Sequence, residues 1–165
     1  MPNWRLPTIH ELKYFTEPIP AGVMVKDPFM NFNNVKTIWS SSPHALSGAI
    51  YIISVNGFMN GRVALLDRNK TSSIWPVKEL GREDNEILAH RDNERFVKLG
   101  NYKIYDRITK LVWLEDPTLL GKETFDNAML FAPSMDYILE NIINNDTDRG
   151  VANIVTIPMP IRRKQ

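Results

Sequence analysis

The sequence predicts an α+β fold in which short strands, short helices and long irregular segments are mixed. An apolar, β-rich run, AIYIISVN (49–56), is followed by a Gly/Asn turn and a second run, RVALLD (62–67), which is the pattern of a β-hairpin. Helical spacing of apolar residues occurs over 6–15 and again over 122–145. The chain has 165 residues, of which 43% are hydrophobic and 24% are charged, and this suits one domain with its own core.

The N-terminal helix is predicted from LPTIHELKYF (6–15). Thr8 and Glu11 have the spacing of a capping box, in which each side chain accepts a hydrogen bond from the backbone N–H of the other residue. The apolar stripe of this helix consists of Ile9, Leu12 and Phe15. We expect the helix to stop at Pro18 and Pro20.

Loops and strands are predicted to alternate from residue 21 to residue 80. A loop over 21–35 carries an aromatic patch of Phe29 and Phe32. A short strand, TIWSSSPH (37–44), precedes the hairpin. A further strand, SSIWPVKEL (72–80), is expected at an edge or irregular position, because Pro76 has no N–H to donate.

The remaining residues are predicted to form a connector, two strands, two helices and a last strand. Residues 81–94 are dense in charge and suit a solvated connector or a short exposed helix. Two strands are expected within 95–116, around DRITK (106–110). The later elements are a helix over 122–131 with Phe125, Ala128 and Met129 inward, a helix over 134–145, and a strand over 151–157 followed by a basic tail.

Composition excludes several classes of chemistry. The chain has no cysteine, which rules out disulfides, thiolate catalysis and Cys-ligated zinc or iron–sulfur clusters. Its net charge of +1 gives no general attraction to nucleic acid, and no nucleic-acid partner is expected. No apolar run approaches the roughly 20 residues of a membrane span, and MPNWRLPTIHEL contains no signal core. No cofactor is expected.

Several motifs resemble a known family. NWRLPTIHEL (3–12), IWSSSP (38–43) and IWPVKEL (74–80) occur in the order found in the C-terminal domain of Legionella collagen-like adhesins, a domain of exported bacterial proteins. KIYDRITKLVWLED (103–116) is similar to the opening hairpin of that family, and ETFDNAML (123–130) is similar to the helix after it. The resemblance covers residues 3–80 and 95–131.

The resemblance implies a C-type-lectin-like fold, with a small twisted antiparallel sheet, two to three helices and long loops that carry ligand contacts. It also implies a set of structural motif residues: Trp4, Arg5, Leu6, Pro7, Thr8, Glu11, Trp39, Ser40, Ser41, Pro76, Asp106, Thr109 and Trp113. Two positions depart from the family pattern. Lys110 replaces a turn glycine, so the turn is expected to form without positive φ, and Trp75 replaces an arginine.

The order of the segments also differs from that of the family, in which the hairpin and helix come first. Here the Arg-Leu-Pro-Thr segment occupies 1–80 and a connector occupies 81–94. The hairpin and helix follow at 95–133, and a helix, strand and basic tail at 134–165 complete what is expected to be one structural domain. Three arrangements are open: a permuted domain that closes on itself, a piece of a tandem array, or complementation between neighbouring subunits.

Arg5, Ser40 and Ser41 could each have a functional or a structural role. Arg5 suits an anion grip, but a structural guanidinium bonded to Asp106 or Glu11 is favoured. Ser40 and Ser41 lack a nucleophile elbow, although His44 is near them in sequence, and backbone hydrogen bonding is favoured.

Metal sites are disfavoured on similar grounds. The three histidines, His10, His44 and His90, are too widely spaced in sequence to indicate zinc. NNDTDRG (144–150) partly matches a calcium loop through Asn144, Asp146 and Asp148, but its glycine comes one position late and no glutamate stands at the twelfth position. A helix-ending turn is favoured there.

The sequence therefore favours a non-enzymatic binding module of an exported or surface-associated bacterial protein, similar to an adhesin or lectin. Its partner would be a glycan or a protein, and an exposed tryptophan would suit stacking on a sugar, although all four tryptophans stand in apolar contexts that favour the core. The alternative is a structural subunit that self-associates into an oligomer or filament through its permuted halves. The related formylglycine-generating enzymes need active-site cysteines, which this chain lacks.

Overall fold

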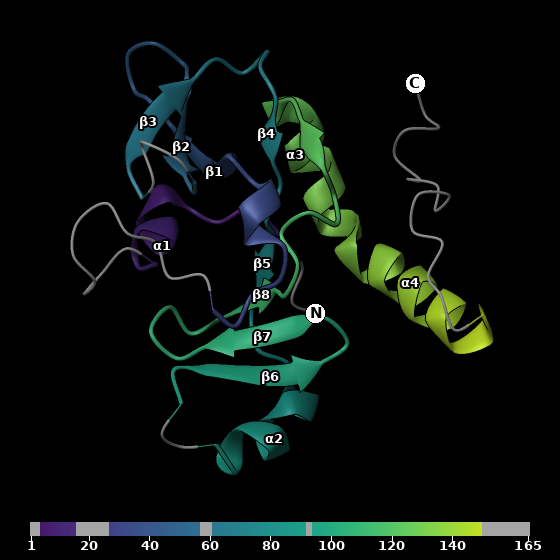
Figure 1. Cartoon of the computed structure of the whole chain (residues 1–165). Helices are drawn as coiled ribbons and strands as arrows, with labels where there is room; N and C mark the ends of the chain where they lie inside the picture. The colour runs from purple at the N-terminus through teal and green to yellow at the C-terminus, as the bar shows by residue number, and fades with distance from the viewer. Residues whose placement is uncertain (1–3, 16–26, 57–60, 92–93, 150–165) are drawn as a thin grey trace.

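The computed structural model describes residues 4–15, 27–56, 61–91 and 94–149, and the statements below refer to those residues. They form two β-sheets surrounded by helices, which confirms the α+β class (Figure 1). Two sheets take the place of the one small sheet that was expected. The predicted strand at 151–157 and the basic tail lie outside the described residues.

The first sheet has five strands in the order β3-β2-β1-β4-β9. Its strands are β1 (Thr37–Pro43), β2 (Ile50–Ser54), β3 (Val63–Leu66), β4 (Ser72–Ser73) and β9 (Lys122–Glu123). The predicted hairpin is confirmed, because β2 and β3 pair in antiparallel register. The sheet is not wholly antiparallel, since β1 and β4 pair in parallel through Ile38 and Ser73.

The second sheet has four antiparallel strands in the order β5-β8-β7-β6. Its strands are β5 (Val77–Lys78), β6 (Phe96–Gly100), β7 (Lys103–Asp106) and β8 (Leu111–Leu114). The two strands predicted around DRITK (106–110) are β7 and β8, but residues 95–116 also hold a third strand, β6, because Gly100, Asn101 and Tyr102 all have positive φ and turn the chain there. The single strand predicted over 72–80 is also divided between the two sheets, at Ile74–Trp75–Pro76.

Four α-helices flank the sheets. They are α1 (Ile9–Lys13), α2 (Asn85–Ala89), α3 (Phe125–Phe131) and α4 (Met135–Arg149), with 3-10 turns at Phe32–Asn34, Arg82–Asp84 and Ala132–Ser134. The short helix predicted in 81–94 is confirmed, whereas α1 ends before Pro18 and Pro20. In α3, Phe125 and Ala128 are buried as predicted, but Met129 is 46% exposed and Phe131 takes the inward position. No helix in these ranges has both the length and the apolar character needed to cross a bilayer.

Aromatic side chains form the centre of the core. All four tryptophans are at most 1% exposed, so the expectation that they belong to the core is confirmed and none of them is available to stack on a sugar. Trp75 lies 4.4 Å from Trp113 between ring centroids. Its other ring neighbours are Phe15, Phe29 and Phe32, and Phe96 packs on Phe15 and Phe29.

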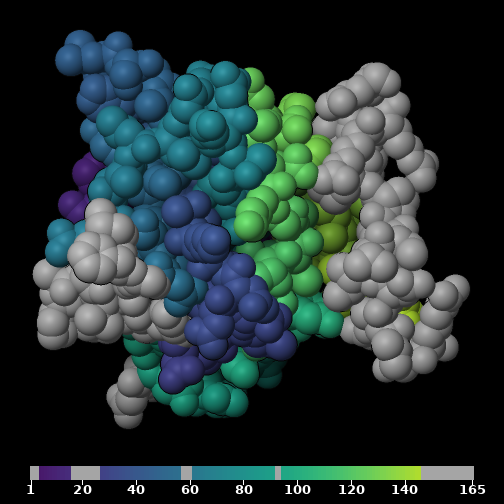
Figure 2. Space-filling view, turned by 45° about the horizontal axis from the view of Figure 1, so that its top comes forward, coloured from purple at the N-terminus to yellow at the C-terminus, as the bar shows by residue number. Residues whose placement is uncertain are grey.

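The N-terminal and C-terminal segments pair with each other within one chain. Strand β5 pairs with β8, and β4 pairs with β9. The Trp39 indole N–H donates to the Glu123 carbonyl at 2.7 Å, and the Trp75 indole N–H donates to the Leu114 carbonyl at 2.7 Å. Figure 2 shows the green part of the chain, which includes α3, lying against the blue and teal N-terminal half.

Candidate functional site

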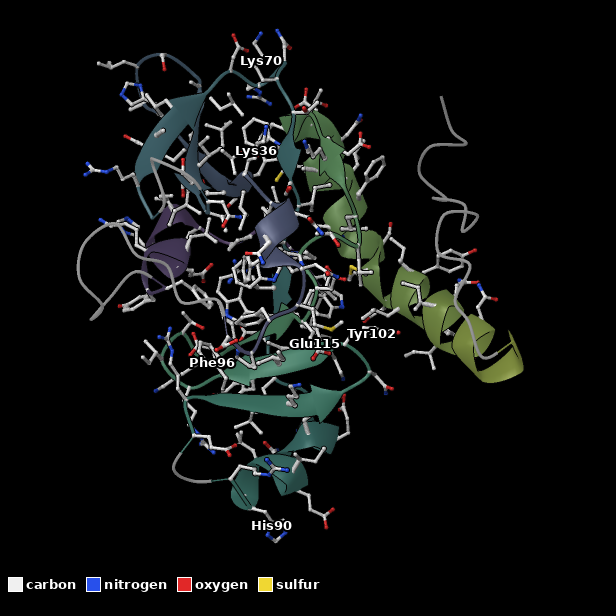
Figure 3. The ribbon with its side chains drawn as sticks, in the orientation of Figure 1. Lys36, Lys70, His90, Phe96, Tyr102 and Glu115 are labelled. Atoms are coloured by element: carbon white, nitrogen blue, oxygen red, sulfur yellow. The ribbon has the colours of Figure 1, made fainter. Side chains whose placement is uncertain are left out.

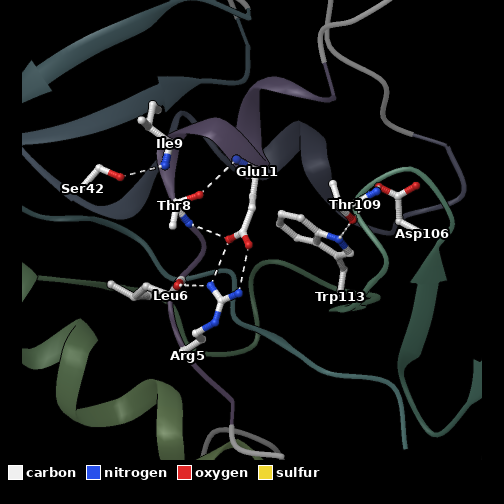
Figure 4. A network of polar contacts seen from close by, with 9 residues as sticks. All are labelled: Arg5, Leu6, Thr8, Ile9, Glu11, Ser42, Asp106, Thr109 and Trp113. Atoms are coloured by element: carbon white, nitrogen blue, oxygen red, sulfur yellow. Dashed lines mark hydrogen bonds and ion pairs between the residues drawn. The ribbon is translucent and has the colours of Figure 1, made fainter.

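The Arg-Leu-Pro-Thr segment forms a clamp around the start of α1 (Figure 4). Both terminal nitrogens of Arg5 donate to the Glu11 carboxylate at 2.9 Å, and one also donates to the Leu6 carbonyl at 3.1 Å. Glu11 accepts from the Thr8 N–H at 2.8 Å, and its own N–H donates to the Thr8 hydroxyl at 3.2 Å, so the predicted capping box is confirmed. The backbone of Arg5 pairs with Val77, which fixes this segment to β5.

This contact shifts the pKa of both partners. The hydrogen bond to Glu11, together with its negative charge, raises the pKa of Arg5 above its ordinary value. Burial acts to raise the pKa of Glu11, but the hydrogen bonds from Arg5 and from the Thr8 N–H outweigh it, and the net pKa is lowered. A lowered folded-state pKa means that the contact stabilises the fold above the ordinary glutamate value of about 4.3 and loses that contribution as the pH falls through the folded value.

Of the two partners expected for Arg5, Glu11 is confirmed, whereas Asp106 pairs with Arg95 and is the centre of a second network. Its buried carboxylate accepts two hydrogen bonds from Arg95, at 2.9 and 3.3 Å, and one from the Ile108 N–H at 3.1 Å. It also accepts from the Thr109 N–H at 3.4 Å and from the Thr109 hydroxyl at 2.9 Å. That hydroxyl accepts from the Trp113 indole N–H at 3.0 Å, so the three motif residues of the hairpin form one chain of hydrogen bonds.

The turn between β7 and β8 does use positive φ, which corrects the expectation for Lys110. Lys110 has a φ of 59° and its N–H donates to the Asp106 carbonyl at 2.7 Å. A lysine in this left-handed region is strained, whereas glycine is not. The neighbouring hydrogen bonds of Asp106 hold the turn in this conformation.

Replacing Lys110 with glycine is therefore expected to raise the free energy of unfolding by about 0.5–1 kcal/mol, because the strain at positive φ is removed. Urea denaturation of the two proteins measures this difference. Lys110→Ala is the matched control, since it removes the charge and keeps the strain, and no gain is expected from it. A gain of equal size in both variants would trace the effect to the charge.

Ser40 and Ser41 take part in backbone hydrogen bonding. The buried Ser40 hydroxyl donates to the Tyr51 carbonyl at 2.6 Å and accepts from the Ser42 N–H at 3.0 Å. The Ser41 N–H donates to the Pro7 carbonyl at 2.8 Å. His44 Nδ1 contacts the Ser47 hydroxyl at 3.0 Å.

The candidate calcium loop is not formed. Helix α4 runs through Arg149, so residues 144–149, including Asn144, Asp146 and Asp148, have helical backbone where a loop would be needed. The helix-ending turn expected over the same residues is also absent up to Arg149. Within the described residues, no group of three or more histidine, aspartate or glutamate side chains is placed to hold a metal ion.

A charged cleft lies between the second sheet and the start of α4. Its volume is about 660 Å³, and a pocket of about 220 Å³ adjoins it along α4. Lys78, Lys103 and Asp136 line both. The cleft thus joins β5 and β7 of the sheet to the helix.

The two lysines of the cleft are fixed by buried neighbours. Lys78 is only 9% exposed in its side chain, and its ammonium lies 5.2 Å from the centroid of the Trp4 ring and 3.9 Å from Asp136 Oδ1. Asp136 Oδ1 also accepts from the Trp4 indole N–H at 2.7 Å. Lys103 Nζ lies 3.5 Å from Oδ2 of the buried Asp84, an ion pair without hydrogen-bond geometry.

Both hydrogen-bond donors and acceptors line this cleft. Further donors come from Arg82, Asn101 and Asn144, and further acceptors from Glu83 and Glu140. Apolar surface is supplied by Leu80, Leu139 and Ile143. Such a lining can hydrogen-bond a ligand that both donates and accepts, and can pack on its apolar face.

Sequence reasoning missed this cleft. Lys78 and Lys103 occur inside apolar runs, IWPVKEL and NYKIYD, much as Arg5 occurs inside NWRLP, and that repeated pattern was the available signal. Asp84 lies in the segment interpreted as a solvated connector, yet it is buried. Nothing in the local sequence indicates that Asp136, on α4, meets Lys78 and Trp4.

Comparison with known proteins found no match: no family model, no curated protein and no solved structure is significantly similar to this chain. The function is therefore argued from the cleft and its contacts.

Proposed function

We propose that this chain is a non-enzymatic binding module of a surface-associated bacterial protein, with a C-type-lectin-like fold, and that its ligand is a carbohydrate held in the cleft of Lys78, Lys103 and Asp136. The observation that carries the proposal is that lysine donors and carboxylate acceptors line the same cleft beside apolar side chains. The family resemblance of the Arg-Leu-Pro-Thr and hairpin motifs supports the adhesin-like assignment.

The chemistry of sugar hydroxyls matches this lining. A hydroxyl donates one hydrogen bond and accepts others, a lysine ammonium only donates, and an ionised carboxylate only accepts. Lys78 Nζ and Asp136 Oδ1 are 3.9 Å apart, so neighbouring hydroxyls of one sugar ring can accept from the lysine and donate to the aspartate. The apolar residues Leu139 and Ile143 suit the C–H face of the ring.

The cleft is also organised before any ligand arrives. The stems of Lys78 and Lys103 are largely buried, with side chains 9% and 14% exposed, and both ammonium groups are placed by carboxylates. Fixing such long side chains in advance reduces the entropy lost on binding. This favours a ligand site over a merely solvated charged surface.

The competing function is assembly through exchanged halves. An exchange between subunits would need unpaired strands in each half, but β5 already pairs with β8 and β4 with β9 inside one chain. The binding module is therefore favoured, and size-exclusion chromatography with light scattering is expected to find a monomer at all concentrations. A concentration-dependent oligomer would favour the assembly function.

A glycan array probed with labelled protein tests the carbohydrate proposal. We expect binding to a subset of glycans, and a loss of about tenfold in apparent affinity for Asp136→Asn, because a charge-assisted hydrogen bond is weakened. Asparagine keeps an oxygen for the Trp4 N–H, so the fold is expected to persist, as thermal unfolding will show.

Asp126→Asn is the matched control on the same array. Asp126 is an exposed aspartate of α3, paired with Arg68 and outside the cleft, and its replacement is expected to leave binding unchanged. Equal losses of glycan affinity in the two variants would show that the cleft is not the glycan-binding site. No signal from any glycan at high protein concentration would contradict a carbohydrate ligand.

A further inference from the structure

A second pocket lies on the five-stranded sheet and shares no lining residue with the cleft. Its volume is about 200 Å³. The polar residues around it come from the start of β1, from β4 and the residue before it, and from β9: Lys36, Thr37, Thr71, Ser73 and Lys122. Ile52 of β2 contributes apolar wall. We propose that this pocket binds a tetrahedral oxyanion, either a phosphate or a sulfate group.

The charge of the pocket favours an anion. Both ionisable residues in its lining are lysines, Lys36 and Lys122. In the described part of the chain neither lysine has a carboxylate within ion-pair distance, whereas Lys78, Lys98 and Lys103 each do. Two uncompensated cations at one concave site attract an anion.

Glu123, the acidic residue next to Lys122, does not cancel this charge. Successive residues of a strand point to opposite faces, so Glu123 and Lys122 diverge from β9. The Glu123 carboxylate accepts from the Asn127 side chain of α3 at 3.2 Å, and its backbone carbonyl accepts from Trp39. The acid is thus engaged with the helix side of the strand.

Strand register places a hydroxyl beside one of the lysines. Ser73 and Lys122 are directly opposite in the antiparallel pair of β4 and β9, which sets their side chains on one face. Ser73 is buried, and its hydroxyl makes no hydrogen bond to any described residue. Ser73 lines the pocket, so this hydroxyl is available to donate a hydrogen bond to an anion oxygen there.

The size of the pocket and the direction of its donors select the class of anion. About 200 Å³ is below the roughly 300–1,000 Å³ of clefts for drug-sized ligands, so the pocket suits a small group. Its ammonium and hydroxyl donors come from three different strands. Oxygens that point in four directions satisfy such donors better than the two coplanar oxygens of a carboxylate.

The test is a titration of isotope-labelled protein with sodium sulfate and, separately, with sodium phosphate, followed by amide chemical shifts at ionic strength held constant with sodium chloride. We expect saturable shifts in β4 and β9. Lys36→Met and Lys122→Met should each weaken binding about tenfold or more, as the loss of a charged hydrogen bond does, and Ser73→Ala should weaken it about threefold. Thermal unfolding verifies that each variant is folded.

Lys70→Met is the matched control, because Lys70 is an exposed lysine at the end of the same sheet that does not line the pocket (Figure 3). It should bind as tightly as the parent. Equal weakening by Lys70→Met and Lys122→Met would show a diffuse field in place of a site, and absence of saturable shifts with both anions would overturn the proposal.

Two further titrations distinguish the source of the group. Glycerol 3-phosphate and N-acetylglucosamine 6-sulfate carry the two anions on organic carriers, and the one that binds more tightly than its inorganic ion identifies the source. Weaker binding of both would confine the site to the free ions. Asp136→Asn should change the affinity for neither inorganic sulfate nor inorganic phosphate, so a failure of the oxyanion site is distinguishable from a failure of the carbohydrate cleft.

Discussion

Replacement of Asp106 with alanine is expected to lower the free energy of unfolding by about 3–5 kcal/mol. Asp106 has no solvent exposure, and its carboxylate accepts five hydrogen bonds, two of them from Arg95. Its removal leaves the Arg95 guanidinium, only 20% exposed, without a counter-charge and leaves the Thr109 N–H without an acceptor. Urea denaturation followed by tryptophan fluorescence measures the change.

Asp126→Ala provides the comparison. That carboxylate also pairs with an arginine, at 2.7 Å from Arg68, but it is 73% exposed, and such surface pairs contribute about 1 kcal/mol or less. The Asp106 variant should therefore lose several times more stability than the Asp126 variant. Losses of similar size would mean that the Asp106 network does not hold the hairpin.

Replacement of Trp75 with alanine is expected to cost about 5 kcal/mol, near the top of the range for a buried tryptophan. Its ring is completely buried and packs against Phe15, Phe29, Phe32 and Trp113. Its indole N–H also donates to the Leu114 carbonyl, so the truncation leaves both a cavity and a buried acceptor without its donor. Thermal and urea unfolding report the loss.

Trp75→Phe separates the two parts of this cost. Phenylalanine keeps most of the packing and loses only the hydrogen bond, so we expect a loss of about 1–3 kcal/mol. Tyr137→Ala, at a side chain 45% exposed on α4, should cost less than either variant. A Trp75→Ala protein as stable as Tyr137→Ala would contradict the central role assigned to the aromatic cluster.

The two networks around Arg5 and Asp106 account for the motif residues in physical terms. In the first network, Glu11 bonds the backbone at the start of α1, and the Arg5 backbone pairs with β5. In the second, Asp106 bonds the backbone of the turn after β7, and Thr109 bonds the buried Trp113. The Arg5 guanidinium bonds Glu11. The motif therefore fixes the scaffold, and the proposed ligand cleft lies beside it.

Elements that depend on residues close together in the sequence could be predicted from it. The capping box of Thr8 and Glu11 depends on residues three apart, and the hairpin of β2 and β3 on alternating apolar residues around a short turn, so both could be predicted. The burial of all four tryptophans followed from their apolar neighbours. The failures were the strand boundaries at Gly100–Tyr102 and at Pro76, where the backbone changes direction inside an apolar run.

The α+β class, the position of α1, the hairpin and the apolar character of the core could be predicted from the sequence, because each depends on residues close together in the chain. The contact of Asp106 with Arg95 and not Arg5, and the cleft shared by Lys78 and Asp136, could not be predicted in this way. Those contacts join residues from different elements, and their partners are chosen by how the two sheets and α4 pack. The periodicity of apolar residues does not indicate which distant side chains meet, so the cleft could be identified only from the folded chain.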